Sequence, residues 1–254
     1  MKLEGTCVVV TGGAGGIGAA LARRFAAEGA RGVVVADLPR TPLEAVAADI
    51  GGLAVPCDVT LEGEIAGIVE VTESRYGPID LFCSNAGVAL LGGPEAPDSD
   101  WELSIGVNVM AHVYAARILV PRMLERGGGY LLQTASAAGL VTQLGSAPYA
   151  VTKHAAVALA EWLSITYGDR GLKVSVLAPQ AVRTAMTAGV EGGGVAGVDG
   201  MLEPEVVADA VVEGLDREDF LILPHPEVLQ YFRRKADDYE RWLAGMRRLQ
   251  TRYS

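Results

Sequence analysis

Short apolar runs alternate with segments of helical periodicity along most of the chain. Three early runs are apolar on both faces, which is typical of parallel strands buried between helices: Cys7–Val10, Gly32–Asp37 and Leu53–Asp58. Helical patterns follow the first and the third run, over Ile17–Glu28 and from about Leu61 to Tyr76. Strands and helices that alternate in this way predict right-handed crossovers and an α/β fold with a doubly wound parallel sheet.

The same alternation continues toward the C-terminus. Ile79–Ser84 and Gly129–Thr134 are the predicted fourth and fifth strands, and a long helix is expected between them from Asp100 to about Glu125. Farther along, Glu203–Leu215 has the pattern of a helix and Phe220–Leu223 that of the last strand. The whole chain, 1–254, is therefore expected to form a single domain.

Two segments near the C-terminus lie outside this alternation. Residues 185–203 combine a short helical pattern with Glu191-Gly-Gly-Gly194, the composition of a lid over a substrate pocket, with a plain surface loop as the alternative. Apolar residues then recur at steps of three and four, which predicts one amphipathic helix over 226–250. Acids on its polar face argue against a membrane role, and we expect it to pack on its own subunit or near a subunit interface.

Composition narrows the possible partners. The 254 residues are 50% hydrophobic, with 21 Lys and Arg against 31 Asp and Glu, so the net charge is -10. Without a polybasic run, a nucleic-acid or anionic-membrane partner is not expected. The N-terminus lacks the apolar region of a signal peptide, and no apolar run approaches the roughly 18 residues of a membrane span. Cys7, Cys57 and Cys83 have no metal spacing and fit a reducing compartment, so we expect a cytoplasmic protein without a metal.

The first apolar run leads directly into the glycine-rich stretch Thr11–Gly18 and then into a helix. Gly12, Gly16 and Gly18 would permit a tight turn, and the helix start offers free N–H groups, so this stretch predicts a cradle for a pyrophosphate. Asp37 ends the second run, where a dinucleotide fold places a carboxylate that binds ribose hydroxyls and repels a 2′-phosphate. A turn aspartate is the alternative, and Arg40 nearby leaves NADP use open.

Further polar and small residues follow the later strands. Asp58 and Val59 end the third run and could meet an adenine, although Asp58 is equally suited to a strand-ending turn. After the fourth run, Ala86 and Gly87 would let a cofactor lie against bare backbone. Asn108 interrupts an apolar helix, so it is either a structural polar plug or part of a proton path; the residues alone favour the plug.

Three residues suggest acid/base chemistry. If Tyr149 opens a helix, Lys153 lies one turn later on the same face. A free tyrosine has a pKa near 10, and an adjacent ammonium would lower it toward neutrality. Ser136 could donate to the same oxygen and polarise a substrate carbonyl. A Tyr-x3-Lys pair is, on its own, also a common feature of helix surfaces.

Taken together, the motifs resemble the short-chain dehydrogenase/reductase family, single-domain branch. They occur in that family's order and spacing from about Leu3 to Thr184, and they are Thr11-Gly-x3-Gly-x-Gly18, Asp37, Asp58-Val59, Asn85-Ala-Gly87, Asn108, Ser136, Tyr149-x3-Lys153 and Val182-x-Thr184. The resemblance implies a Rossmann-type sheet of about seven parallel strands with helices on both faces, and a nicotinamide cofactor; Asp37 predicts NAD over NADP. It also implies a homodimer or homotetramer formed through the helices that begin near Trp101 and Tyr149.

The resemblance implies a role for each site residue. Tyr149 would be the acid/base, Ser136 would orient the reacting oxygen, and Lys153 would hold the nicotinamide ribose and lower the tyrosine pKa. Asn108 would fix a water in the proton relay, and Thr184 would bind the nicotinamide carboxamide. The expected cofactor contacts are Gly12, Gly16, Ile17, Gly18, Asp37, Asp58, Val59, Asn85, Ala86, Gly87, Tyr149, Lys153, Val182 and Thr184.

Two residues depart from the family pattern; the first is a mild change expected to alter only local hydrogen bonds, and the second bears on the substrate. Ser84 replaces the first Asn of Asn-Asn-Ala-Gly, and Gln180 replaces the Gly that usually follows Pro179. We expect Ser136, Leu144, Gln180 and Met186 to contact the substrate. The presumed lining has no basic residue and favours an uncharged substrate; it consists of Leu90, Leu91, Leu140, Val141, Leu144, Met186 and Val190.

The sequence thus predicts an NAD-dependent oxidoreductase. It would transfer hydride between the nicotinamide and an uncharged, largely apolar secondary alcohol or ketone, with Tyr149 as acid/base. The alternative is a catalytically silent NAD-binding regulatory protein of the same fold. A sugar-nucleotide epimerase is disfavoured because such enzymes carry a substrate domain after the sheet, for which 254 residues leave no room.

Overall fold

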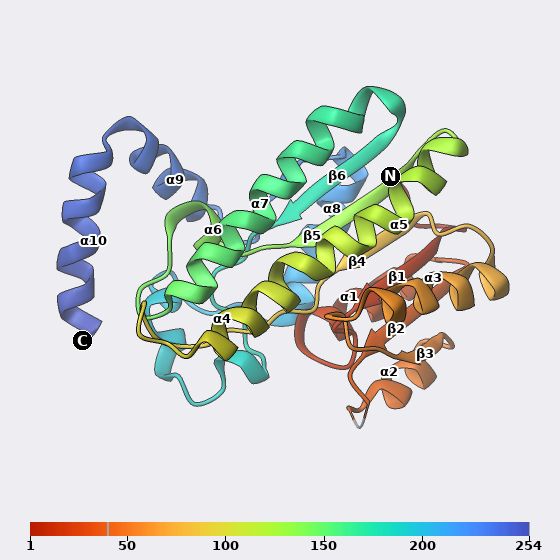
Figure 1. The fold of residues 1–254 in the computed structure, drawn as a ribbon, viewed down its shortest axis with the longest axis horizontal. Helices are drawn as coiled ribbons and strands as arrows, with labels where there is room; N and C mark the ends of the chain where they lie inside the picture. Colours follow the sequence, from red (N-terminus) through yellow and green to blue (C-terminus); the bar gives the residue numbers. More distant parts are fainter. Residues whose placement is uncertain (40, 254) are drawn as a thin grey trace.

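One parallel sheet forms the centre of the molecule. The computed structural model describes residues 1–39 and 41–253, and within them seven strands lie in the order β3-β2-β1-β4-β5-β6-β7 (Figure 1). The strands are β1 Cys7–Thr11, β2 Gly32–Asp37, β3 Leu53–Pro56, β4 Leu81–Ser84, β5 Gly129–Thr134, β6 Leu172–Leu177 and β7 Leu221–Ile222. This is the predicted Rossmann-type fold. The strand order reverses between β1 and β4, where the connections leave to opposite sides and open a crevice at the carboxyl ends.

Helices cover both faces of the sheet. They are α1 Gly16–Ala27, α2 Leu43–Asp49, α3 Glu62–Tyr76, α4 Asp98–Ile105, α5 Ala111–Glu125, α6 Ala138–Val141, α7 Ala147–Tyr167, α8 Pro204–Arg217, α9 Glu227–Asp237 and α10 Tyr239–Tyr253. Helices α3, α5 and α7 share one apolar cluster with one face of the sheet, and α1, α2 and α8 share a second cluster with the other face. The strands are buried because each lies between these two layers.

The helix predicted from Asp100 to Glu125 contains a π-helical turn. The helical stretch runs from Asp98 to Glu125, and Gly106–Met110 forms the π turn between α4 and α5. By length and composition this stretch is apolar enough to cross a membrane, contrary to the prediction from the sequence. Half of its most apolar window is buried inside the protein, where α5 packs on α3 and the sheet.

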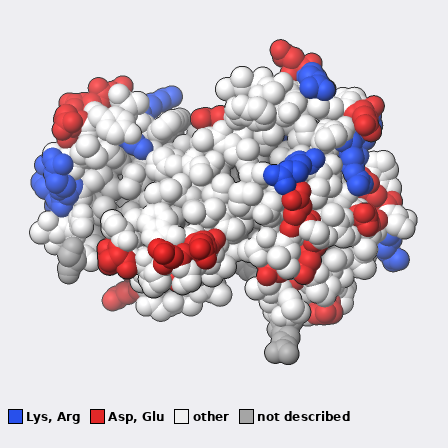
Figure 2. Space-filling model, viewed as in Figure 1, with Lys and Arg blue, Asp and Glu red and all other residues white. Residues whose placement is uncertain are grey.

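The predicted single C-terminal helix over 226–250 is wrong, because two helices occupy this region. Asp238 is extended (φ -153°, ψ 93°) and separates α9 from α10, and its Oδ1 accepts a hydrogen bond from the Arg241 N–H at 2.9 Å. Val228 of α9 is fully buried, whereas α10 has no buried residue. Figure 1 shows α10 at the margin of the molecule, and Figure 2 shows acidic and basic side chains on that margin.

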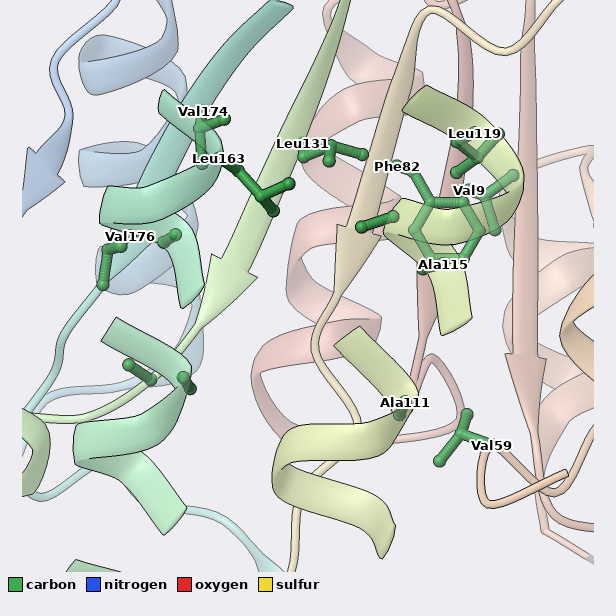
Figure 3. Close-up of a cluster of buried hydrophobic side chains, with 14 of the residues drawn as sticks. Val9, Val59, Phe82, Ala111, Ala115, Leu119, Leu131, Leu163, Val174 and Val176 are labelled. Atoms are coloured by element: carbon green, nitrogen blue, oxygen red, sulfur yellow. The ribbon is translucent and has the colours of Figure 1, made fainter. Parts of the chain in front are cut away.

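The core beneath α5 illustrates how the sheet and helices are joined. Val9 of β1 lies beside Phe82 of β4 in register, and Leu119 of α5 packs on both in the same cluster (Figure 3). Phe82 is 1% exposed and the other two side chains are fully buried. These contacts fix the position of α5 relative to the strands on both sides of the crevice.

Shortening Leu119 tests this core. We expect Leu119→Ala to lower the free energy of unfolding by about 2–5 kcal/mol, because a buried leucine is lost and a cavity remains. Urea denaturation followed by circular dichroism measures the effect. Val71→Ala on α3, at a side chain that is 45% exposed, is the matched control and should change the free energy by about 0.5 kcal/mol or less. Equal effects at both positions would contradict this description of the core.

Candidate active site

A cleft of about 550 Å³ runs along the carboxyl ends of the strands. Every residue predicted to contact the cofactor lines it, from the glycine turn after β1 to Val182 and Thr184 after β6. Ser136, Gln180 and Met186 line the same cleft. The chain thus brings together side chains that are far apart in the sequence, because parallel strands end at one edge of the sheet.

The glycine turn needs its missing side chains. Gly12 has φ 64°, and a Cβ there would lie 2.8 Å from the Cα of Ala86. A Cβ on Gly18 would collide with the carbonyl oxygen of Gly12. Asn85 reinforces this approach, since its Nδ2 donates to the Thr11 carbonyl oxygen at 3.0 Å. The turn after β1 and the loop after β4 are therefore held together, and no side chain of Gly12 or Gly18 fills the cleft.

The start of α1 and the end of β2 suit a dinucleotide. The N-cap residue Gly15 has no side chain, and the first turn of α1 has no acidic residue. The free N–H groups at the start of α1 therefore face the cleft without a side-chain acceptor. Asp37 accepts hydrogen bonds from the N–H groups of Ala14 (3.0 Å) and Leu38 (2.8 Å). Its carboxylate also lines the cleft, which fits a partner with free hydroxyls. Arg40, which left NADP use open, lies outside the described residues.

Asp58 combines the two alternatives that the sequence left open. Its Oδ1 accepts from the Thr60 N–H at 2.9 Å and from the Thr60 hydroxyl at 2.7 Å, which is a strand-ending turn. Asp58 and Val59 also line the cleft. On the opposite wall, the Thr184 side chain lies over the glycine turn, where a Cβ on Gly16 would meet its Cγ2 at 2.9 Å.

Tyr149 and Lys153 lie on the same face of α7, as predicted. The helix begins at Ala147, two residues earlier than expected, and Ser146 caps it by accepting from the Tyr149 N–H at 3.3 Å. The Lys153 Nζ is 5.6 Å from the centroid of the Tyr149 ring and donates to the Thr134 carbonyl oxygen at 2.9 Å. The end of β5 therefore fixes the ammonium behind the phenol.

The pKa of Tyr149 differs from the prediction. Burial raises it above 10, and a hydrogen bond with Ser136 opposes the rise. The expected lowering by Lys153 is not found in this structure, because removing the phenolate from water outweighs other effects. Burial also lowers the pKa of Lys153 to about 8. Ser136 lies next to both residues in the cleft, and its own Oγ donates to the Pro179 carbonyl oxygen at 3.3 Å.

Asn108 is fully buried in the π-helical turn and joins three elements. Its Nδ2 donates to the Val88 carbonyl oxygen (2.9 Å) and to the Thr152 hydroxyl (3.0 Å), and its Oδ1 accepts from the Val88 N–H (3.0 Å). This is the polar plug that the residues alone favoured. Asn108 does not line the cleft itself. Thr152, which the sequence reasoning missed, follows Pro148 by one helical turn and also donates to its carbonyl oxygen.

The predicted substrate lining needs correction. Leu144 does not line the cleft, because the loop before α7 pairs with the loop at Gly92 through a bridge between Gly92 and Ser146. Leu90 and Leu91 belong to that paired loop, Leu140 is buried in the core, and Val190 is exposed outside the cleft. Val141 does not line this cleft but lines a second cavity that shares Ser136 with it. Sequence reasoning missed three apolar residues that line the cleft, Val88, Leu103 and Val107. Val88 follows Gly87, which lies against Lys153, whereas Leu103 and Val107 flank Gly106, which lies against Thr60 after β3.

Gln180 and the segment after it form the far end of the cleft. The Gln180 N–H donates to Nδ1 of His225 at 3.2 Å, and its Oε1 is buried without a partner among the described residues. The expected lid, 185–203, contains two short 3-10 segments, Ala185–Thr187 and Glu191–Gly197. A bridge between Val182 and Leu202 ties the ends of this segment together.

Comparisons with known proteins agree with this site. The model of the short chain dehydrogenase family matches residues 6–192. A 1-deoxy-11-beta-hydroxypentalenate dehydrogenase from Streptomyces exfoliatus is 38% identical over 94% of this chain and 90% of its own length. A meso-2,3-butanediol dehydrogenase from Serratia marcescens is 33% identical over 74% of this chain and 76% of its own length.

A solved structure extends the agreement to three dimensions. A short chain dehydrogenase/reductase from Burkholderia phymatum in complex with NAD has a TM-score of 0.86 and 26% identity, over 94% of this chain and 96% of that one. The family match, the relatives and the cleft with Ser136, Tyr149 and Lys153 lead to one conclusion. This chain is a member of the short-chain dehydrogenase/reductase family, a family of oxidoreductases that includes dehydrogenases of alcohols.

Proposed function

We propose that the protein is an NAD-dependent dehydrogenase that interconverts a secondary alcohol and its ketone. The observation that carries this proposal is the placement of Tyr149, Ser136 and Lys153 together on the wall of the cleft that begins at the glycine turn. A catalytically silent NAD-binding protein would not need a buried lysine fixed behind a buried tyrosine. Burying a charged side chain costs free energy, and buried ionisable groups with shifted pKa values are typical of functional sites.

The chain's own residues divide the chemistry between them. Bound nicotinamide would supply the hydride acceptor or donor. In oxidation, the Tyr149 Oη takes the proton from the substrate hydroxyl, and in reduction it returns that proton to the ketone oxygen. The Ser136 Oγ donates a hydrogen bond to the reacting oxygen, and Lys153, held by Thr134, keeps its Nζ 5.6 Å from the centroid of the Tyr149 ring, where it would hold the nicotinamide ribose. Asn108 fixes Val88 and α7, so it positions these groups.

The lining of the cleft favours an uncharged group beside the reacting oxygen. Lys153 is the single basic residue among the lining residues in the described part of the chain, and its Nζ already donates to the Thr134 carbonyl oxygen. The substrate groups next to the carbinol are therefore uncharged. Relatives with names that describe dehydrogenases of a hydroxypentalenate and a butanediol support a hydroxyl group as the point of attack.

We also propose that copies of the chain associate with one another and that the protein is cytoplasmic. Val151, Trp162 and Ile165 of α7 expose apolar surface, with Ile165 84% exposed, which supports association of copies through this helix. Cys7, Cys57 and Cys83 are free and buried, which supports a reducing, cytoplasmic setting.

Removing the phenol hydroxyl tests the acid/base role. We expect Tyr149→Phe to lower kcat for the oxidation of hydrophobic secondary alcohols by about 10²–10⁴-fold, because the proton acceptor is lost. NADH formation at 340 nm measures kcat, and NADH fluorescence shows that the nucleotide still binds. A variant as active as the parent would refute the assigned chemistry, and a parent protein inactive on every alcohol and ketone would favour the regulatory alternative.

The pH profile tests the contribution of Ser136. Alcohol oxidation needs the phenolate, so its rate rises with pH through the pKa of Tyr149. Because the Ser136 hydrogen bond lowers that pKa, Ser136→Ala should shift the rising limb of kcat/KM to higher pH and lower its plateau by about 10²-fold. Ser136→Thr keeps a hydroxyl and should retain the limb of the parent. An unshifted limb in the alanine variant would contradict this account.

Charge removal at Asp37 tests the choice of NAD. We expect Asp37→Asn to raise the ratio of kcat/KM for NADP to that for NAD by about tenfold or more, because the carboxylate no longer repels a 2′-phosphate. Initial rates with both cofactors measure the ratio. Asp49→Asn, at an exposed carboxylate on α2 outside the cleft, is the control. A ratio that stays constant in Asp37→Asn would argue against Asp37 as the selective residue.

A further inference from the structure

A second cavity, of about 870 Å³, lies between the body of the fold and the two C-terminal helices. Ser136 and Gln180 line both this cavity and the nucleotide cleft, so the two spaces meet at the catalytic end. Anything that extends from the reacting oxygen past Gln180 enters the second cavity. The walls of this cavity therefore bear on which substrates reach the catalytic groups.

Apolar residues form part of both walls. Ala138 and Val141 of α6 lie on the side of the body, and Trp242, Met246 and Leu249 of α10 lie on the opposite side. These three α10 residues recur at steps of three and four, so they share one face of the helix. The face that α10 turns to the body thus suits a hydrocarbon skeleton.

Four arginines complete the wall on the side of the C-terminal helices. They are Arg234, Arg241, Arg248 and Arg252. Within residues 1–39 and 41–253, none of their guanidinium groups pairs with a carboxylate, whereas arginines on the body such as Arg117 and Arg122 are in ion pairs. Arg234 lies over the Tyr231 ring, 5.8 Å from its centroid.

Two acids also line this cavity, and they leave the arginines in excess. Asp238 uses its Oδ1 to cap the start of α10, and Asp237 is the second acid. From Glu227 to Arg252 the chain has seven basic and four acidic residues, in a protein of net charge -10. Figure 2 shows basic side chains on the part of the surface that α10 forms. A cavity with excess positive charge in an acidic protein favours an anionic ligand.

Helix α9 holds this wall in place. Its Lys235, 9% exposed, donates to the Leu140 carbonyl oxygen at 2.7 Å, and its Tyr231 hydroxyl donates to Asp199 at 2.9 Å. Leu140 belongs to α6, which closely follows Ser136. The helix that leads into α10 is therefore tied to the element beside the catalytic serine. Arg234 on α9 thus keeps a defined position relative to the body, and α10 follows α9 directly after Asp238.

We propose that the substrate carries a carboxylate remote from its carbinol, and that Arg241 and Arg248 of α10 bind this carboxylate while the hydrocarbon between the two groups fills the second cavity. The proposal rests on the proposed dehydrogenase function and narrows its substrate class to hydroxy or keto acids with an apolar skeleton. Guanidinium groups are suited to this task, since they bind carboxylates with two parallel hydrogen bonds. The sequence predicted an uncharged substrate; under this proposal only the part of the substrate beside Tyr149 is uncharged.

Binding of decanoate tests the anion site without any turnover. Calorimetric titration should show decanoate binding to the parent protein and about tenfold or weaker binding to Arg241→Gln/Arg248→Gln, because a charged hydrogen bond is lost. Arg247→Gln, on the same helix but outside the cavity, is the matched control and should bind as the parent does. Higher salt should weaken binding to the parent, since the arginines are partly exposed. Equal binding by the double variant, or no binding by the parent, would overturn the proposal.

Turnover separates this inference from the function on which it rests. With NAD, the parent should have a kcat/KM for 9-hydroxydecanoate about tenfold or more above that for its methyl ester, and the double variant should treat both alike. If decanoate binding depends on the arginines but no alcohol is oxidised with NAD or NADP, the proposed function fails and the anion site stands. If the double variant loses acid and ester equally, or changes its native mass, α10 acts as a structural or inter-subunit element and the inference is wrong.

Discussion

The buried ammonium of Lys153 is the constraint on which the catalytic centre depends. An ammonium that is 2% exposed is costly to bury, and here the Thr134 carbonyl oxygen and the face of the Tyr149 ring compensate it. The first contact requires the end of β5 to lie directly against α7, whereas Tyr149 is on α7 itself, one turn before Lys153. Gly139 allows α6 to approach α7 closely, because a Cβ there would lie 2.5 Å from the Lys153 carbonyl oxygen. A slip of α7 along the sheet would therefore remove the hydrogen bond to Thr134 and leave the buried ammonium without its acceptor.

The cofactor side of the cleft depends on the close approach of two backbones. The turn at Gly12 and the loop at Ala86 touch where the strand order reverses, and the Thr11 hydroxyl accepts hydrogen bonds from the N–H groups of Asn85 and Ala86. Glycine is required there because any side chain would fill the space where a dinucleotide would meet the helix start. The nucleotide cradle and the catalytic centre thus lie at two positions along the same edge of the sheet.

Local sequence rules predicted the features that depend on neighbours in the chain. The alternation of apolar runs and helical segments predicted the sheet, and the spacing of Tyr149 and Lys153 predicted their common face, because a helical turn fixes it. The direction of the Tyr149 pKa was missed, since burial depends on packing that a spacing does not record. The sequence also did not indicate that Leu144 lies outside the lining of the cleft, as the pairing of its loop with Gly92 is a long-range contact. The break at Asp238 was hidden, because the apolar period continues across it.

Catalysis and substrate recognition place different demands on the chain, and the fold separates them. The groups that move a proton must keep their positions to within a fraction of an ångström, and they sit on β5 and α7, in the most buried part of the molecule. The second cavity is closed by α9 and α10, of which α9 contacts α6 and α10 contacts α9, and neither helix adds a strand to the sheet. The first residue of α6, Ala138, donates its N–H to the Ser136 Oγ. A displacement of the C-terminal helices that moved α6 would therefore first move the hydroxyl that orients the substrate oxygen. Side chains on α9 and α10 can therefore differ in chemistry without any change in β5 or α7, and the reacting oxygen keeps its position relative to Tyr149 as long as α6 does not move.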